Sequence, residues 1–228
     1  MTNSLTKSRE IDVIIYNDLK DNPFFIKILD ILEIACINTA IDLGASSGIS
    51  ALWLLNRLPN VEKIYCFEPD KENYEFLLTN LNQFGDKIAP YNVGIYYGLT
   101  ESKVYGIGDN NPLGYAIEPI KSRTITKHVF EEYYGKIFTL LELESIVDFP
   151  VDFIKMDVEG SEYNIIENST TLKKARFLFI SFHNQDETYV HNIIKEHLSD
   201  YEIILFGGAG TYFDAFLERK TEWQKSSS

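Results

Sequence analysis

The chain has 228 residues, 45% of them hydrophobic, which suits one large α/β domain with a buried core and excludes a disordered composition. Its formal net charge of −13 makes a phosphate backbone a poor partner, so we do not expect nucleic acid to bind. No apolar run approaches the length of a membrane span, which predicts no membrane insertion. Cys36 and Cys66 lack disulfide or metal spacing, which favours a cytoplasmic location.

The first part of the chain ends in a predicted helix. Asn22 and Pro23 form a helix-start signal, and the apolar residues from Phe24 to Ile37 follow helical spacing. We therefore expect a single domain in which residues 1–38 form an N-terminal helical cap, 39–220 the core, and 221–228 a polar tail.

Strands and helices alternate through the core. Strands are predicted at 39–43, 61–67, 87–97 (broken by Pro90 and Gly94), 151–157 and 176–182, and helices at 49–58, 70–84, 140–147, 161–168 and 187–198. This alternation is typical of a mostly parallel sheet with helices on both faces. Residues 106–123 interrupt it with glycine, asparagine and proline, which predicts a long irregular insertion of the kind that covers functional sites.

The last two strands must run in opposite directions. Tyr201–Phe206 and Thr211–Leu217 are both strand-like, and only the four residues from Gly207 to Gly210 join them. A connection this short cannot make a parallel crossover, so the pair is predicted to be an antiparallel hairpin. The sheet is therefore expected to be parallel except for one reversed strand near its end.

A glycine-containing turn follows the first strand. Gly44 and Gly48 frame this turn, and Glu68 ends the second strand about twenty residues later, where a carboxylate can accept hydrogen bonds from a ribose. Ser46 replaces the middle glycine of the dinucleotide pattern, and Asp42 adds a negative charge that suits a cationic cofactor. The pattern favours S-adenosylmethionine, with a purely structural strand-to-helix turn as the alternative.

A second group of polar residues follows the fourth and fifth strands. Asp157 lies at the carboxyl end of its strand, and Lys155 within that strand requires a carboxylate partner. His183 closes the fifth strand, so it is expected to face the same crevice as Asp157 if the two strands are neighbours. Glu159 and Glu162 are placed in the first turn of the next helix, where stabilisation of the helix dipole is the alternative role.

With both groups in view, the chain resembles the FkbM-type family of S-adenosylmethionine-dependent methyltransferases. The most specific segment is Ile154–Glu162, which matches the family's I-K-x-D-x-E-G-x-E run, and Phe67-Glu68-Pro69-Asp70 also fits. The resemblance implies a Rossmann-like class I methyltransferase fold with a seven-stranded sheet and a reversed last strand. It also implies O-methylation of a hydroxyl on a sugar, glycan or small metabolite.

The resemblance assigns roles to particular positions. The residues that it implies as cofactor-binding are Asp42, Gly44, Ala45, Gly48, Glu68, Asn92, Val93 and Asp157, with Glu68 on the ribose and Asn92 and Val93 near the adenine.

The predicted mechanism places an acceptor oxygen against the cofactor's methyl group. We expect His183 or Asp157 to be the base that removes the hydroxyl proton, and Glu159 to orient the acceptor. A divalent metal held by Asp157 and a neighbouring acid is an alternative, but a metal-free site is favoured. Two other classes remain open: an NAD-dependent oxidoreductase or epimerase, and a non-catalytic module that retains the fold.

Overall fold

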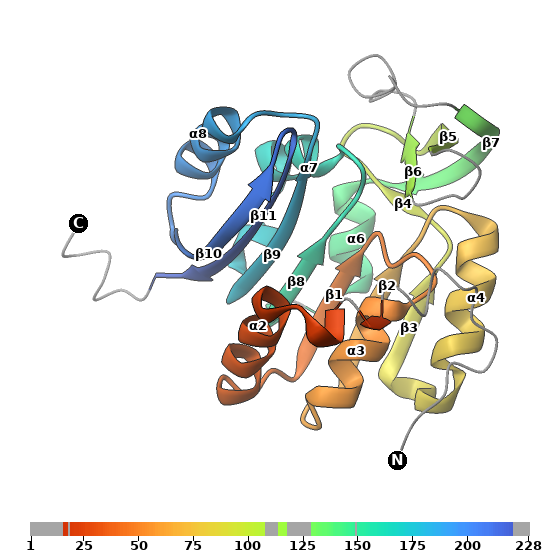
Figure 1. Cartoon of the computed structure of the whole chain (residues 1–228). Helices are drawn as coiled ribbons and strands as arrows, with labels where there is room; N and C mark the ends of the chain where they lie inside the picture. Colours follow the sequence, from red (N-terminus) through yellow and green to blue (C-terminus); the bar gives the residue numbers. More distant parts are fainter. Residues whose placement is uncertain (1–15, 18, 108–113, 118–128, 149, 221–228) are drawn as a thin grey trace.

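The computed structural model of the chain describes residues 16–17, 19–107, 114–117, 129–148 and 150–220. Its larger sheet has seven strands in the order β10-β11-β9-β8-β1-β2-β3 (Figure 1). These strands are β1 (Thr39–Leu43), β2 (Lys63–Phe67), β3 (Ile88–Tyr91), β8 (Phe153–Met156), β9 (Phe177–His183), β10 (Tyr201–Ala209) and β11 (Tyr212–Arg219). β11 runs antiparallel to both of its neighbours, β10 and β9, and all other neighbouring strands of this sheet are parallel, which confirms the predicted reversed strand.

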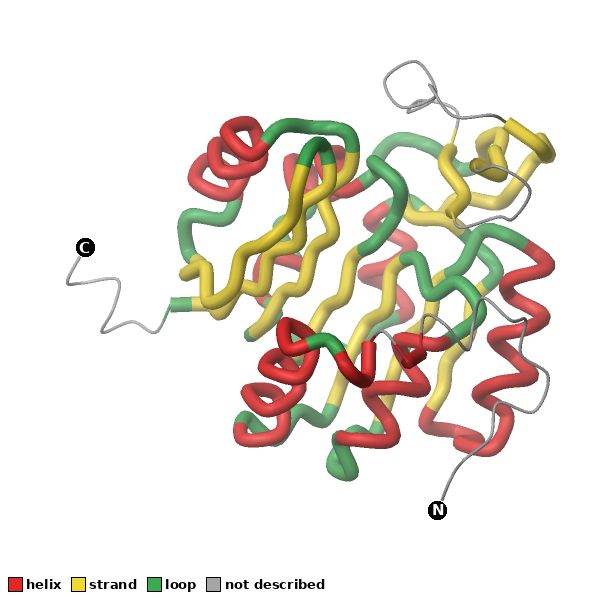
Figure 2. The backbone as a smooth tube through the Cα atoms, viewed as in Figure 1, coloured by secondary structure: helices red, strands yellow, loops and turns green. Residues whose placement is uncertain are grey.

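Helices cover both faces of this sheet (Figure 2). One layer consists of α2 (Pro23–Ile34), α3 (Ile49–Arg57) and α4 (Lys71–Leu81); the other consists of α6 (Leu140–Ile146), α7 (Glu162–Asn168) and α8 (Glu187–His197). Because side chains alternate along a strand, Ala40 packs in the first layer and Ile41 in the second. The predicted placement of helices on both faces of the sheet is confirmed.

Local signals set where two of these helices begin. Asn22 accepts a hydrogen bond from the backbone N–H of Phe24 at 2.9 Å, and Pro23 opens α2 as predicted. The helix ends at Ile34, earlier than the predicted Ile37, and Cys36 just beyond it has a left-handed φ of 53°. Asp70 caps α4 by accepting a hydrogen bond from the N–H of Asn73 at 2.6 Å.

The strand order contains a switch point at β1. The chain moves from β1 outward to β2 and β3, and later returns to β8 on the opposite side of β1. In open α/β sheets, ligands bind beyond the carboxyl ends of the strands at such a point. The turn after β1 and the segment after β8 therefore define where a site is expected.

The C-terminal hairpin is tighter than predicted. The strands β10 and β11 extend into the glycine-rich segment, so that only Gly210 and Thr211 join them. Gly208 has a φ of 144°, and a Cβ there would lie 2.3 Å from the carbonyl oxygen of Tyr212, so the strands approach closely only because this residue is glycine. The hairpin places Tyr212 opposite His183 on β9.

A smaller sheet, absent from the prediction, has the order β4-β7-β5-β6. Its strands are β4 (Gly94–Ile95), β5 (Glu101–Ile107), β6 (Gly114–Ile117) and β7 (Val129–Phe138). The strand-like segment predicted at 87–97, with breaks at Pro90 and Gly94, forms two strands: β3 joins the large sheet, whereas β4 begins at Gly94 and pairs with β7. The irregular insertion predicted at 106–123 is wrong where β6 forms; residues 108–113 and 118–123 lie outside the described residues.

Within the described part of the chain, no helix is both long enough and apolar enough to cross a membrane. The cytoplasmic location stays a prediction. So does the division into cap, core and tail, since residues 1–15 and 221–228 lie outside the described residues.

Candidate active site

The turn after β1 is held against the neighbouring strand. The backbone N–H groups of Gly44 and Ala45 both donate to the carbonyl oxygen of Phe67 at 3.0 Å. Gly44 has a φ of +77°, and a Cβ there would lie 1.8 Å from the carbonyl oxygen of Asp157. The backbones of the segments after β1 and β8 therefore approach each other closely, and only a glycine at position 44 leaves room for this contact.

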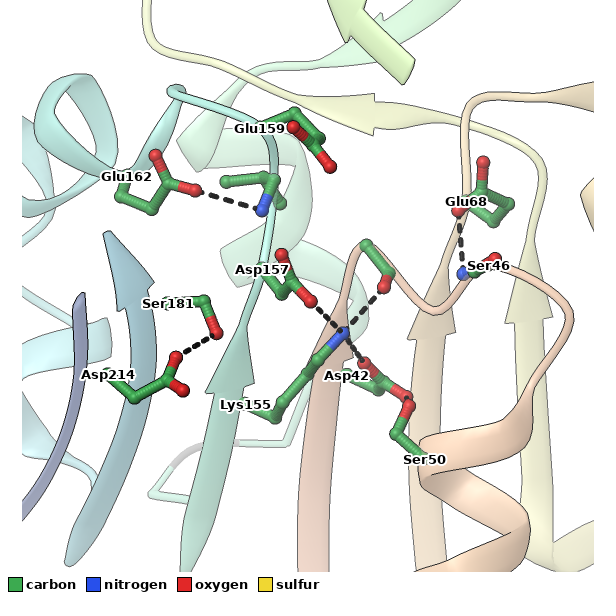
Figure 3. Close-up of polar contacts among 12 residues, drawn as sticks. Asp42, Ser46, Ser50, Glu68, Lys155, Asp157, Glu159, Glu162, Ser181 and Asp214 are labelled. Atoms are coloured by element: carbon green, nitrogen blue, oxygen red, sulfur yellow. Dashed lines mark hydrogen bonds and ion pairs between the residues drawn. The ribbon is translucent and has the colours of Figure 1, made fainter. Parts of the chain in front are cut away.

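Glu68 contacts this turn directly, as Figure 3 shows. Its two carboxylate oxygens accept hydrogen bonds from the N–H groups of Ser46 (2.7 Å) and Asp70 (2.9 Å). Burial of the side chain, which is 4% exposed, raises the pKa of Glu68 to about 7, although the two N–H donors oppose this shift. The structure thus brings together the two features from which the sequence predicted an adenosine site.

A pocket opens beside Glu68. Its lining residues are Gly44, Ser46, Phe67, Glu68, Pro69, Asn73, Val93, Gly94, Ile95, Asp157, Val158, Glu159 and Ser161. Four of the predicted cofactor residues, namely Gly44, Glu68, Val93 and Asp157, are in this set.

The other predicted cofactor residues lie elsewhere. Ala45 lines a second pocket described below, and Gly48, with a φ of +81°, packs against Leu81 at the start of α3. Asn92 donates to the backbone carbonyl oxygens of Glu68 (2.9 Å), Pro69 (3.2 Å) and Asp70 (3.3 Å). Asn92 therefore holds the segment that carries Glu68.

Lys155 links β8 to β1 beneath the pocket (Figure 3). Its Nζ lies 3.1 Å from Asp42, 3.8 Å from Asp157 and 2.6 Å from the carbonyl oxygen of Gly44. Burial alone would lower the pKa of Lys155, but attraction to Asp42 first and Asp157 second raises it. The predicted carboxylate partner of Lys155 is confirmed.

Asp42 lies below the turn rather than in a pocket wall. The residue is 0% exposed, and its carboxylate also accepts a hydrogen bond from Ser50 at the start of α3. Its negative charge therefore acts on the pocket through Lys155, whose ammonium group binds the carbonyl oxygen of the glycine turn.

His183 sits among three carboxylates at the ends of β8 and β9. Its Nδ1 lies 2.8 Å from Glu162, and its Nε2 lies 3.6 Å from Asp157 and 3.8 Å from Glu159. Burial would lower the pKa of His183, but attraction to Glu162 above all, with Glu159 and Asp157, raises it to about 10. The predicted proximity of Asp157 and His183 is confirmed, because β8 and β9 are parallel neighbours.

The two glutamates after β8 differ in position. Helix α7 begins at Glu162, so the prediction that Glu159 lies in its first turn is wrong. Glu159 precedes the helix with a left-handed φ of 51°, which turns its carboxylate toward His183. Glu162 is 0% exposed and accepts hydrogen bonds from the N–H of Val158 at 3.1 Å and from the ring of His183.

The hairpin adds polar groups that the sequence reasoning missed. On β9, Ser181 donates to Asp214 of β11 at 2.7 Å, and the hydroxyl of Tyr212 lies 3.4 Å from Ser181. Burial raises the pKa of Asp214, and repulsion from Asp157 adds to the shift. Asp214 lies between the apolar residues Phe213 and Ala215, and a charged side chain there needs a partner; this is the sequence signal that could have indicated the contact.

A second pocket lies between α2, α3 and the sheet. Its lining residues are Leu19, Phe25, Ile28, Gly44, Ala45, Ser46, Ser47, Ile49, Ser50, Trp53, Leu54, Phe153, Lys155, Asp157, Phe179, Ser181 and Tyr212. Phe25 makes edge-on contacts with Trp53 and Phe179, at 5.9 and 5.6 Å between ring centroids. Because Gly44, Ser46 and Asp157 line both pockets, the two adjoin at the turn after β1.

Comparisons with known proteins identify the class. The profile of the methyltransferase FkbM domain matches residues 42–202. The fold resembles a crystal structure of methyltransferase FkbM from Methylobacillus flagellatus, with 20% identity and a TM-score of 0.50; the match covers 79% of this chain and 44% of that one. It also resembles the METTL16 methyltransferase domain, with 12% identity and a TM-score of 0.53, over 93% of this chain and 80% of that one.

The fold is that of the class I methyltransferases. The chain belongs to the FkbM methyltransferase family. It spans less than half the length of the Methylobacillus flagellatus protein. A search among curated proteins found no match.

Proposed function

We propose that the chain uses S-adenosylmethionine to methylate a hydroxyl oxygen of a sugar, glycan or small metabolite. One observation carries this proposal. Glu68 is hydrogen-bonded to the turn after β1, and in the same pocket lies Asp157 at the end of β8. This arrangement offers a ribose acceptor, a close backbone approach and a negative charge within one cavity.

The residues of the pocket fit the chemistry of this cofactor. Each oxygen of Glu68 accepts one backbone N–H and retains lone-pair capacity for a ribose hydroxyl. Val93 and Ile95 offer apolar surface for the adenine, and Asp157 and Glu159 offer negative charge for the sulfonium. When bound, S-adenosylmethionine supplies an already reactive methyl carbon, so that positioning is the main task of the protein.

Asp157 is the base in this proposal. It lines both pockets, and its side chain is 37% exposed, so a hydroxyl can reach it. The ring of His183 is 11% exposed, with carboxylates facing both of its nitrogens, so it positions Asp157 rather than meeting the acceptor. Glu159 lines the pocket of Glu68 but not the second pocket, so it orients the acceptor oxygen where the two pockets meet. A positioned base typically contributes ~10²–10⁴-fold to the rate.

The second pocket is the proposed acceptor site. Phe25, Trp53 and Phe179 form aromatic walls on which the apolar face of a sugar ring or metabolite can pack. The net charge of −13 opposes a nucleic-acid acceptor.

Calorimetry with S-adenosylhomocysteine and NAD tests the cofactor. The account expects S-adenosylhomocysteine to bind and NAD not to bind. Glu68→Gln should weaken the binding, whereas the exposed Glu72→Gln in α4 should leave it unchanged. Binding of NAD alone would overturn the proposal in favour of an oxidoreductase.

Transfer of a labelled methyl group to a panel of hydroxylated sugars and metabolites tests the reaction. Labelled methyl groups in protein or RNA instead would contradict the proposed class of acceptor.

A further inference from the structure

We propose that Asp157, Glu159 and His183 bind one divalent transition-metal cation at the carboxyl ends of β8 and β9. Their ligand atoms, one carboxylate oxygen from each acid and one ring nitrogen, all lie within 4.8 Å of one another. The inference rests on the proposed methyltransferase function and deepens it, because it names what acidifies the acceptor hydroxyl.

Glu162 prepares the imidazole of His183 for this role. Its carboxylate can only accept hydrogen bonds, so the Nδ1 that lies 2.8 Å away carries a proton and donates it. This leaves Nε2 as the ring nitrogen that faces Asp157 and Glu159, and a cation that binds there displaces the proton that Nε2 otherwise carries. A carboxylate behind a histidine, fixing its tautomer and ring orientation, is the usual outer partner of a metal-binding histidine.

The separations between the ligand atoms suit an ion between them. Nε2 of His183 lies 3.6 Å from Asp157 Oδ1 and 3.8 Å from Glu159 Oε2, both longer than a hydrogen bond. An ion ~2.1 Å from each of two ligand atoms can join atoms up to ~4.2 Å apart. Figure 3 shows Glu159 above Asp157. The side chain of Glu159 is 23% exposed, so its carboxylate can move toward a bound ion.

The kind of cation follows from the ligands. Two carboxylates with one imidazole suit Mn²⁺, Fe²⁺ or Zn²⁺, whereas Mg²⁺ and Ca²⁺ prefer oxygen ligands throughout. The surrounding charge also favours a cation, since Glu162 adds a third carboxylate beside His183, and the ammonium group of Lys155, 3.8 Å from Asp157, lies closer to Asp42 at 3.1 Å.

The cation would take over the task assigned above to the base. A hydroxyl beside a divalent cation has a lowered pKa and loses its proton to solvent water. The resulting oxygen attacks the methyl carbon, the bond between that carbon and sulfur breaks, and its electron pair stays on sulfur. The products are the methylated acceptor and S-adenosylhomocysteine.

Manganese binding to the chelator-treated full chain tests the site. Free Mn²⁺ is measured by its electron paramagnetic resonance signal, and the expected result is one bound Mn²⁺ per chain, displaced by Zn²⁺. Glu159→Gln should weaken binding at least ~10-fold, and Glu162→Gln by ~10–100-fold. Asp214→Asn is the matched control: it removes a half-buried carboxylate from the same crevice without removing a ligand, and should change affinity less than twofold. Thermal melting identifies any variant that fails to fold.

Two results would overturn the inference. One is the absence of Mn²⁺ and Zn²⁺ binding at millimolar concentration. The other is an equal loss of affinity in Asp214→Asn and Glu159→Gln, which would show general attraction to an acidic crevice. S-adenosylhomocysteine binding is measured in the same samples, so that failure of the metal site can be distinguished from failure of the cofactor assignment. If that ligand binds and the metals do not, only the metal site is lost; if a metal binds and that ligand does not, only the cofactor assignment is lost.

Discussion

Replacement of Gly44 by alanine tests the close approach of the turn after β1 to the end of β8. The new Cβ would lie 1.8 Å from the carbonyl oxygen of Asp157, whereas real Cβ contacts are essentially never shorter than 3.0 Å, so the two segments must separate by about 1.2 Å. The left-handed φ of +77° adds its own cost. Gly98→Ala is the matched control, because Gly98 has a φ of +84° and open space around its Cβ position.

The two variants separate backbone strain from the clash. A left-handed alanine costs about 1–2 kcal/mol, which is the whole loss expected for Gly98→Ala. Overpacking costs a further ~1–3 kcal/mol, so Gly44→Ala should lose about 2–5 kcal/mol of unfolding free energy in a urea titration. A displacement of about 1 Å in a site can cost ~10²-fold in activity, so affinity for S-adenosylhomocysteine should fall in Gly44→Ala alone. Equal losses of stability and affinity in both variants would refute the reasoning.

Three further predictions concern charged groups of the site. Because the carboxylate of Glu68 has a pKa of about 7 and its ionised form accepts the ribose hydroxyls, affinity for S-adenosylhomocysteine should fall by up to about tenfold per unit as pH drops below 7. Calorimetry on Glu68→Gln should show no such dependence. Lys155→Met leaves Asp42 buried without its cation and should cost about 3–5 kcal/mol in urea unfolding, with part of the loss recovered in the double variant with Asp42→Asn. His183→Ala should lower kcat by ~10–100-fold, because Asp157 loses its positioning partner, while affinity for S-adenosylhomocysteine stays unchanged, because His183 does not line that pocket. A rate equal to that of wild type would remove His183 from the mechanism.

The parts of the fold that local patterns encode were predictable. The alternation of apolar strands with helices, the cap at Asn22 and the short link after β10 each carry their own signal, and they predict α2 and a parallel sheet with one reversed strand. The number of seven strands came from the resemblance to the FkbM-type family. The small sheet was not predictable in this way. Its strand β4 has two residues, and its pairing with β7 joins segments more than forty residues apart, so nothing local indicates it.

Some residues of the candidate site could likewise be predicted from local sequence, and others could not. Glu68 and Asp157 follow from their places at strand ends, because the carboxyl ends of parallel strands share one edge of a sheet. The partners of His183 depend on the register of β9 against β8 and on the residue at which α7 begins. The contact between Ser181 and Asp214 depends on the register of β11 against β9. Registers of this kind are set by packing across the whole sheet.

A crystal structure with S-adenosylhomocysteine tests the central claim most directly. The account predicts the ribose hydroxyls within hydrogen-bond distance of Glu68 and the sulfur facing Asp157, next to the pocket walled by Phe25 and Phe179. A ligand seated away from the turn after β1, with Glu68 untouched, would contradict it.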